Sequence, residues 1–173
     1  MTTIERLPGE ETTRPVATLR GPKPGDIGWV VQSHGAVYAA EFGFGLVFEG
    51  LVAEIVADFA ASFDASRERC WIADIDGRPV GSVFLVRESD EIAKLRLLIV
   101  DPAGRGQGLG HRLVRECIGF ARQCGYRTIT LWTHSILLAA RKIYHDEGFV
   151  MVASEPHRSF GVELVGETWE LRL

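Results

Sequence analysis

Cysteine is scarce in this chain of 173 residues, which has three cysteines and no C-x-x-C pair. An odd number without paired spacing argues against a disulfide framework and favours reduced thiols in a core. Long apolar runs are missing as well, because none approaches the roughly 18 residues that a membrane helix needs. The first residues carry acids rather than a basic and then apolar signal segment. We therefore expect a cytoplasmic protein with no membrane partner.

Positive charge is also not in excess. The 19 lysines and arginines face 23 aspartates and glutamates, which gives a formal net charge of -4 and an isoelectric point near 5.7. A general nucleic-acid surface needs a basic footprint, so we expect no nucleic-acid partner. The five histidines form no H-E-x-x-H motif and no cluster with cysteines. We therefore expect no metal site.

The length and composition fit one globular domain. Hydrophobic residues make up 46% of the chain and charged residues 24%, which is ordinary for a fold with a substantial core. Residues 1–14 are polar and lack apolar periodicity. We expect a flexible tail there and a single domain over residues 15–173.

Apolar periodicity predicts both helices and strands. Asp26 is suited to cap a helix, Asp76-Gly77 indicates a hairpin turn, and Gly125 and Gly148 are typical of helix ends. We expect helices over residues 26–42, 47–63, 109–124 and 136–146. We expect strands over residues 16–20, 71–74, 79–86, 93–100, 128–132, 149–153 and 167–172.

The most informative segment is a glycine-rich turn between an apolar strand and an amphipathic helix. Its glycines are Gly104, Gly106, Gly108 and Gly110, and Arg105 adds a full positive charge. Backbone N–H groups in such a turn can converge on an anion at the helix N-terminus. The spacing fits neither the P-loop nor the dinucleotide-binding fingerprint. It matches [RQ]-x-x-G-x-[GA]; the alternative is a glycine-rich turn that binds no ligand.

With the strand before it and the helix after it, this segment resembles the acetyl-CoA-binding motif of the GNAT superfamily of N-acetyltransferases. The predicted order of strands and helices is similar to that of the superfamily from end to end. The resemblance implies an α/β (α+β) fold with a mixed, mostly antiparallel central sheet flanked by helices. In that fold the fourth and fifth strands splay apart, aided by a bulge, and acetyl-CoA is the cosubstrate.

The resemblance also implies where acetyl-CoA binds. The pyrophosphate would lie on the loop residues Arg105, Gly106, Gln107, Gly108, Leu109, Gly110 and His111. The pantetheine arm would bond to the strand edge at Leu98, Ile99 and Val100. Leu137 occupies a position where the family often has asparagine, so that contact is missing or comes from His134 or Ser135.

Tyr144 matches the general-acid position of the family in its Y-x-x-x-G-F pattern. A phenol with a pKa of about 10 can protonate a thiolate whose conjugate acid lies near 8.5 if the site encloses both groups. The alternative is that Tyr144 is an ordinary core aromatic residue.

Three polar residues, His34, Tyr38 and Glu41, continue the apolar stripe of the first predicted helix. One interpretation is that they line the pocket for the amine acceptor, with Glu41 binding or deprotonating the amine. The other is a buried hydrogen-bond network of purely structural use.

Several segments outside the glycine loop are similar to the acetyltransferase half of proteins that fuse a MarR-type winged helix to a GNAT domain. We expect no winged helix here, because about 14 leading residues are too few to form one. The predicted function is transfer of an acetyl group to a primary amine of a small molecule or peptide by direct attack in a ternary complex. The alternative is a non-catalytic CoA-binding sensor module, and a homodimer is left open.

Overall fold

The computed structural model describes residues 15–173, so the tail predicted over residues 1–14 lies outside the described residues. The strands are β1 (Thr18–Arg20), β2 (Arg69–Ile75), β3 (Arg78–Arg87), β4 (Ile92–Val100), β5 (Thr128–His134), β6 (Val150–Ser159) and β7 (Val162–Arg172). The helices are α1 (Asp26–Phe42), α2 (Leu46–Ser62), α3 (Leu109–Gln123) and α4 (Leu138–Asp146). Within the described part of the chain, no helix is both long and apolar enough to cross a membrane.

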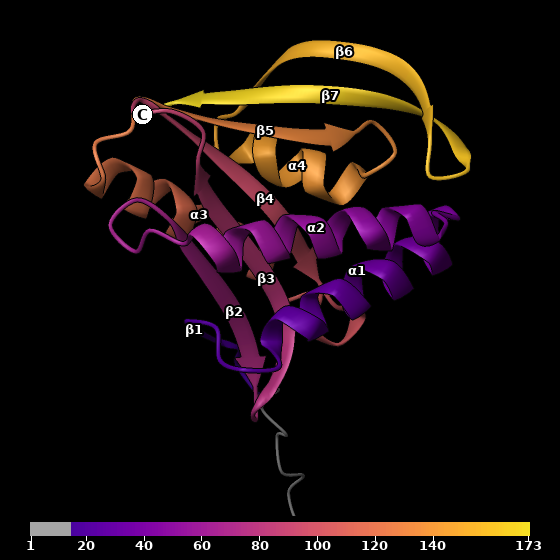
Figure 1. The fold of residues 1–173 in the computed structure, drawn as a ribbon, viewed down its shortest axis with the longest axis horizontal. Helices are drawn as coiled ribbons and strands as arrows, with labels where there is room; N and C mark the ends of the chain where they lie inside the picture. Colours follow the sequence, from indigo (N-terminus) through magenta and orange to yellow (C-terminus); the bar gives the residue numbers. More distant parts are fainter. Residues whose placement is uncertain (1–14) are drawn as a thin grey trace, which may run out of the picture.

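The seven strands form one sheet in the order β1-β2-β3-β4-β5-β7-β6 (Figure 1). Every neighbouring pair is antiparallel except β4 and β5, which run parallel. The mixed, mostly antiparallel sheet predicted from the sequence is therefore confirmed.

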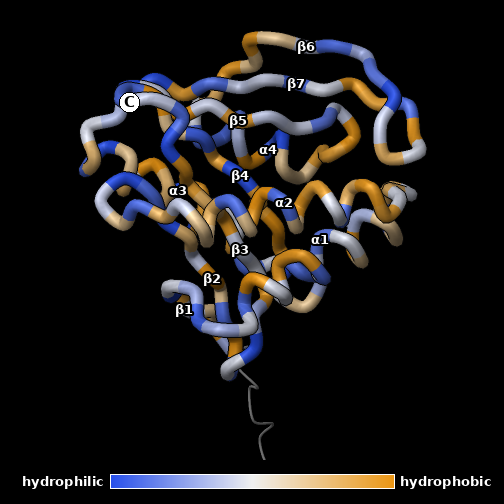
Figure 2. Tube along the Cα trace, viewed as in Figure 1, coloured by the Kyte–Doolittle hydropathy of each residue, from blue (hydrophilic) through white to orange (hydrophobic). Residues whose placement is uncertain are grey.

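Helices cover both faces of this sheet. Side chains of α3, together with Tyr144 from α4, pack on one face in a core that includes Leu85 and Leu113. Side chains of α1 and α2 pack on the other face in a second core that includes Phe84. Figure 2 shows hydrophobic segments along α2 and the central strands, where the helices and the sheet meet.

The parallel strands β4 and β5 separate soon after they begin. They pair at only three positions, from Ile92 opposite Thr128 to Lys94 opposite Thr130. Beyond Lys94, β4 continues to Val100 without a partner on that edge. The predicted splay of the fourth and fifth strands is thus confirmed, and it leaves backbone groups available to a ligand.

A bulge in β4 accompanies the separation. Ser82 pairs with Ile99 and Phe84 with Arg96, so two β4 residues lie opposite the single β3 residue between them. One of the two, Leu97, has a φ of 52°, and its carbonyl accepts a hydrogen bond from Ser82 Oγ at 3.1 Å. A bulge increases local twist, which turns β4 away from β5.

The C-terminal hairpin is much longer than the sequence indicated. β6 extends to Ser159 and β7 begins at Val162, around a turn in which Phe160 and Gly161 have positive φ values of 57° and 86°. Polar residues and Pro156 conceal the strand character of this segment. An edge strand tolerates proline because its outer N–H groups need no ladder partner.

The prediction that Asp26 caps α1 is wrong. Asp26 is the first helical residue, and Gly25 precedes it at the cap position with a φ of 98°. The Asp26 carboxylate instead accepts hydrogen bonds from the Arg20 guanidinium at 2.5 Å and the Lys23 N–H at 2.7 Å. These contacts tie the start of α1 to β1.

Candidate active site

The glycine-rich loop leaves the N-terminus of α3 free for an anion. Gly106 and Gly108 have φ values of 81° and 66°, which side chains with a Cβ rarely adopt. Gly108 caps α3 and has no side chain, so within residues 15–173 no side-chain cap occupies the first N–H groups of the helix. Gly110 has a different role, because a Cβ there would lie 2.5 Å from Ile143 Cδ1. The lack of a Cβ at Gly110 lets α3 pack against α4.

A cavity of about 400 Å³ opens beside this loop. Nine of the residues predicted to bind acetyl-CoA line it: Leu98, Ile99, Val100, Arg105, Gly106, Gly108, Leu109, Gly110 and His111. Gln107 and His134, predicted for the same role, do not line this cavity. The cavity therefore joins the glycine-rich loop to the free edge of β4, as a ligand with a phosphate and an extended arm would require.

Glu41 also lines the cavity beside the loop. Its carboxylate lies 2.6 Å from the guanidinium of Arg105, and both side chains are partly exposed. Glu41 is therefore near the proposed phosphate site, although the sequence grouped it with His34 and Tyr38.

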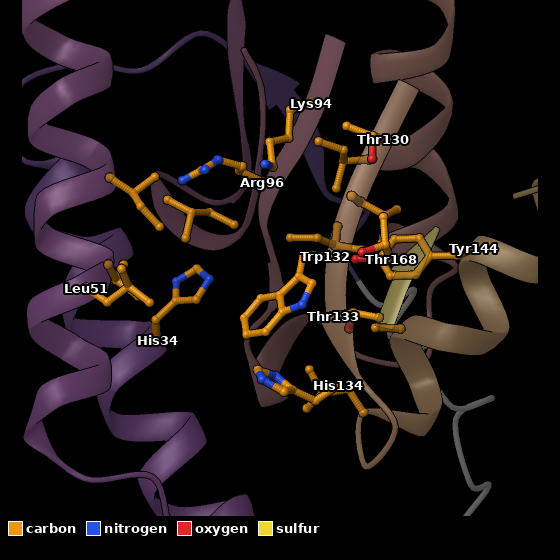
Figure 3. Close-up of a pocket in the computed structure, with 18 of the residues that line it drawn as sticks. His34, Leu51, Lys94, Arg96, Thr130, Trp132, Thr133, His134, Tyr144 and Thr168 are labelled. Carbon is orange, nitrogen blue, oxygen red and sulfur yellow. The ribbon is translucent and has the colours of Figure 1, made fainter. Parts of the chain in front are cut away.

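A second cavity, of about 610 Å³, lies between α1, α2 and the separated strands (Figure 3). His34, Tyr38, His134 and Tyr144 all line it. The residues that line both cavities are Tyr38, Leu98, Leu137 and Ala140. The two cavities thus adjoin near the bulge in β4, and a ligand held in one can reach a group held in the other.

His34 is held in one protonation form at neutral pH. The ring is 2% exposed, and its Nδ1 lies 2.8 Å from the carbonyl oxygen of Val30. A carbonyl only accepts hydrogen bonds, so Nδ1 carries the proton and Nε2 keeps its lone pair. Burial lowers the pKa of His34 to about 4. The ring points from α1 toward Trp132 in Figure 3, so this lone pair is available to the cavity.

Tyr144 comes from α4 on the other side of the same cavity (Figure 3). The side chain is 5% exposed and packs near the rings of Phe149 and Trp169. Burial raises the pKa of its hydroxyl well above the usual value. The hydroxyl is therefore protonated at neutral pH and can donate a hydrogen bond or a proton. Burial likewise raises the pKa of Tyr38 to about 12.

His134 lies at one end of this second cavity (Figure 3). Burial lowers its pKa to about 4, with a further contribution from His157 nearby. Its Nε2 has no hydrogen-bond partner among residues 15–173. In that same part of the chain, no group of three or more His, Cys, Asp or Glu side chains could hold a metal ion.

Lys94 and Arg96 lie at the opposite end of the cavity, and the sequence did not single them out (Figure 3). They are two residues apart on β4, so they share one face of that strand. The sequence did contain a signal for this pair. Two cations on one face of a central apolar strand require either a neutralising partner or a functional role.

Acidification is expected to destabilise the fold through these neutral histidines. Between an unfolded pKa of about 6.5 and a folded pKa of about 4, the unfolded chain takes up a proton at His34 that the folded chain refuses. Stability therefore falls as pH drops through this window, by about 2 kcal/mol from His34 at about pH 5. His134 acts in the same direction.

Urea unfolding of the parent and of His34→Gln at about pH 7.5 and about pH 5 measures this effect. The variant should lose about 2 kcal/mol less than the parent on acidification. His145 has an exposed ring, so His145→Gln is the matched control and should lose as much as the parent. An equal loss in His34→Gln and the parent would show that His34 is not held neutral.

The chain matches known proteins over most of this region. The model for the acetyltransferase (GNAT) family matches residues 37–149. The N-acetylaspartate synthetase of Xenopus tropicalis is 35% identical over 88 residues, which are 50% of this chain and 32% of that protein. The probable N-acetyltransferase camello of Xenopus laevis is 35% identical over 115 residues, 62% of this chain and 52% of that protein. The chain thus spans a third to a half of the length of these relatives.

A solved structure agrees with the fold over nearly the whole chain. It is that of yncA from Salmonella typhimurium, solved with its cofactor acetyl-CoA. The TM-score is 0.72 at 20% sequence identity, and the match covers 91% of this chain and 94% of that one. The arrangement of the strands and the family match over residues 37–149 lead to one conclusion: the chain belongs to the GNAT family of acetyltransferases.

Proposed function

We propose that this protein transfers the acetyl group of acetyl-CoA to a primary amine of a small molecule or peptide, by direct attack in a ternary complex. The observation that carries this is the pair of adjoining cavities at the opening between β4 and β5. One contains an anion-binding loop, and the other contains a protonated phenol and a neutral imidazole. Two substrates that must meet can each bind on their own side.

The cavity beside the loop suits acetyl-CoA. The N–H groups at the start of α3 and the positive φ angles of Gly106 and Gly108 suit a pyrophosphate. The unpaired edge of β4 from Leu98 to Val100 suits the amides of a pantetheine arm. A relative of known structure was solved with acetyl-CoA. In this binding mode the thioester would lie near the residues that line both cavities.

Acetyl-CoA supplies a thioester carbonyl, and residues of this chain donate and accept the protons of the reaction. The amine nitrogen forms a bond to the carbonyl carbon, and the carbon–sulfur bond breaks. Tyr144 gives its hydroxyl proton to the departing thiolate sulfur. The products are the acetylated amine and CoA with a free thiol.

We assign the proton acceptor for the amine to His34. Its Nε2 lone pair is available in the second cavity, and its Nδ1–H is held by Val30. A ring with a pKa of about 4 is a weak base, but the amine becomes strongly acidic as its bond to carbon forms. Glu41 was the sequence-based alternative; its pairing with Arg105 in the other cavity favours His34.

Thiol release from acetyl-CoA across a panel of primary amines tests the proposed activity. We expect release to depend on the amine and to yield one acetylated product per thiol. Acetyl-CoA should also raise the melting temperature, because it binds only the folded chain. A non-catalytic sensor would bind acetyl-CoA and release thiol only at the background rate with every amine.

We also propose a cellular location and an acceptor class for this protein. We place the protein in the cytoplasm, in keeping with the three cysteines, which are all free thiols. The acceptor is a small molecule or an exposed peptide amine. The similarity to MarR–GNAT fusion proteins suggests a further interpretation, in which this protein acts together with a separate transcriptional regulator.

A further inference from the structure

The second cavity carries two positive charges at one end. Lys94 and Arg96 project from the same face of β4, away from His134 at the other end, with His34, Trp132 and Tyr144 between them (Figure 3). Both cationic side chains are only partly exposed. A charge in such a position loses part of its hydration, and a bound anion can compensate it.

The protein itself neutralises only one of these charges. Among the described residues that line the cavity, Glu88 is the only carboxylate, and it lies 3.6 Å from Lys94. Within residues 15–173, Arg96 has no carboxylate oxygen within 4.0 Å and no side-chain hydrogen bond to another residue. The guanidinium therefore presents its fork of N–H donors without a partner.

Neighbouring acids of the described residues form no ion pair with Arg96. Asp58 of α2 and Glu68 border the adjoining groove that Arg96 also lines. The Glu68 carboxylate accepts hydrogen bonds from the backbone N–H groups of Arg87 and Asp64 instead. His34 and His134 are uncharged at neutral pH, so they add no positive charge and need no anion of their own.

On the basis of the acetyl transfer inferred above, we propose that the acceptor is a small amino acid whose carboxylate binds Arg96 and Lys94 while its amine reaches His34. A planar guanidinium binds a carboxylate through two parallel hydrogen bonds, which also fixes orientation. A cavity of about 610 Å³ accommodates a molecule of this size. A second ammonium group at this end would meet like charge, so polyamines are excluded as good acceptors.

The experiment compares each L-amino acid with its own carboxamide as the acceptor. The two differ only in the charged group. For the amino acids that are acetylated fastest, kcat/KM from thiol release should be at least about tenfold higher than for the matching amides. Arg96→Gln should lower kcat/KM for the acid by about tenfold to a hundredfold, mainly through KM, and leave kcat/KM for the amide unchanged. Lys94→Gln should have a smaller effect, because Glu88 already neutralises Lys94.

Arg87→Gln is the matched control, because Arg87 pairs with Asp90 and does not line the second cavity. It should match the parent with both acceptors. Equal use of acids and amides, or an Arg96→Gln loss of the same size for both, would overturn the inference while leaving the acetyl transfer intact.

A binding measurement separates this inference from the proposed function. Calorimetric titration of the same amino acids into the CoA complex should give heats that Arg96→Gln abolishes. If no acceptor is acetylated but Arg96-dependent binding persists, the carboxylate site stands and the proposed activity fails. If amino acids neither bind nor react while uncharged amines do react, the carboxylate site is refuted and the activity stands.

Discussion

Replacing Tyr144 with phenylalanine is expected to lower kcat by about a hundredfold or more, which is the range for losing a general acid. The hydroxyl acts only as the thiolate forms, so the affinity for acetyl-CoA should be unchanged. Burial keeps the pKa of Tyr144 well above its usual value, so the hydroxyl of the parent stays protonated throughout the neutral range. Steady-state kinetics with a good acceptor, together with calorimetric titration of acetyl-CoA, measure both effects.

Tyr126 offers a matched control for this change. It is also buried, its hydroxyl donates a hydrogen bond to the carbonyl oxygen of Arg67 at 2.9 Å, and it lines neither cavity. Tyr126→Phe should cost about 1 kcal/mol of stability without a change in kcat. If Tyr144→Phe behaves in the same way as Tyr126→Phe, Tyr144 is a core aromatic residue and not an acid.

Placing a negative charge at Gly108 should weaken acetyl-CoA binding by at least about tenfold relative to an uncharged residue of the same shape. Gly108 lies at the N-terminus of α3 with a φ of 66°, and a Cβ there meets no other atom within 4 Å. Aspartate and asparagine both tolerate this backbone conformation. The pair Gly108→Asp and Gly108→Asn therefore isolates the charge.

Calorimetric titration of acetyl-CoA into the two variants measures the difference. Salt provides a second check, because screening should bring their affinities closer as ionic strength rises. Melting temperatures establish that both variants are folded. Equal affinities at low salt would mean that the phosphates bind elsewhere, and the assignment of the loop would have to be abandoned.

Local chemistry explains why much of the fold could be predicted. A turn of Asp76 and Gly77, a run of β-branched residues in β5 and a glycine-rich start to α3 depend on residues that are neighbours in the sequence. The full length of the β6–β7 hairpin escaped prediction, in part because β6 is an edge strand that buries little. Without burial there is no apolar alternation to detect.

The bulge in β4 was expected only by resemblance to a family. Leu97 and Leu98 lie in an uninterrupted apolar run, and nothing in such a run indicates which residue adopts a φ of 52°. That conformation depends on the pairing of β3 with β4 and on the hydrogen bond from Ser82. Both partners are distant in the sequence, so only the folded sheet defines the bulge.

The sequence by itself determined the glycine-rich loop, the helix that begins there and the tyrosine of α4, because each is a local pattern. Only the tertiary structure separated His34 from Glu41, which share one helix but line different cavities. It also brought Arg96 into a cavity with Tyr144, about 50 residues away. The physical reason is that charge balance and access to a cavity depend on every element packed around a side chain, and no single segment contains that information.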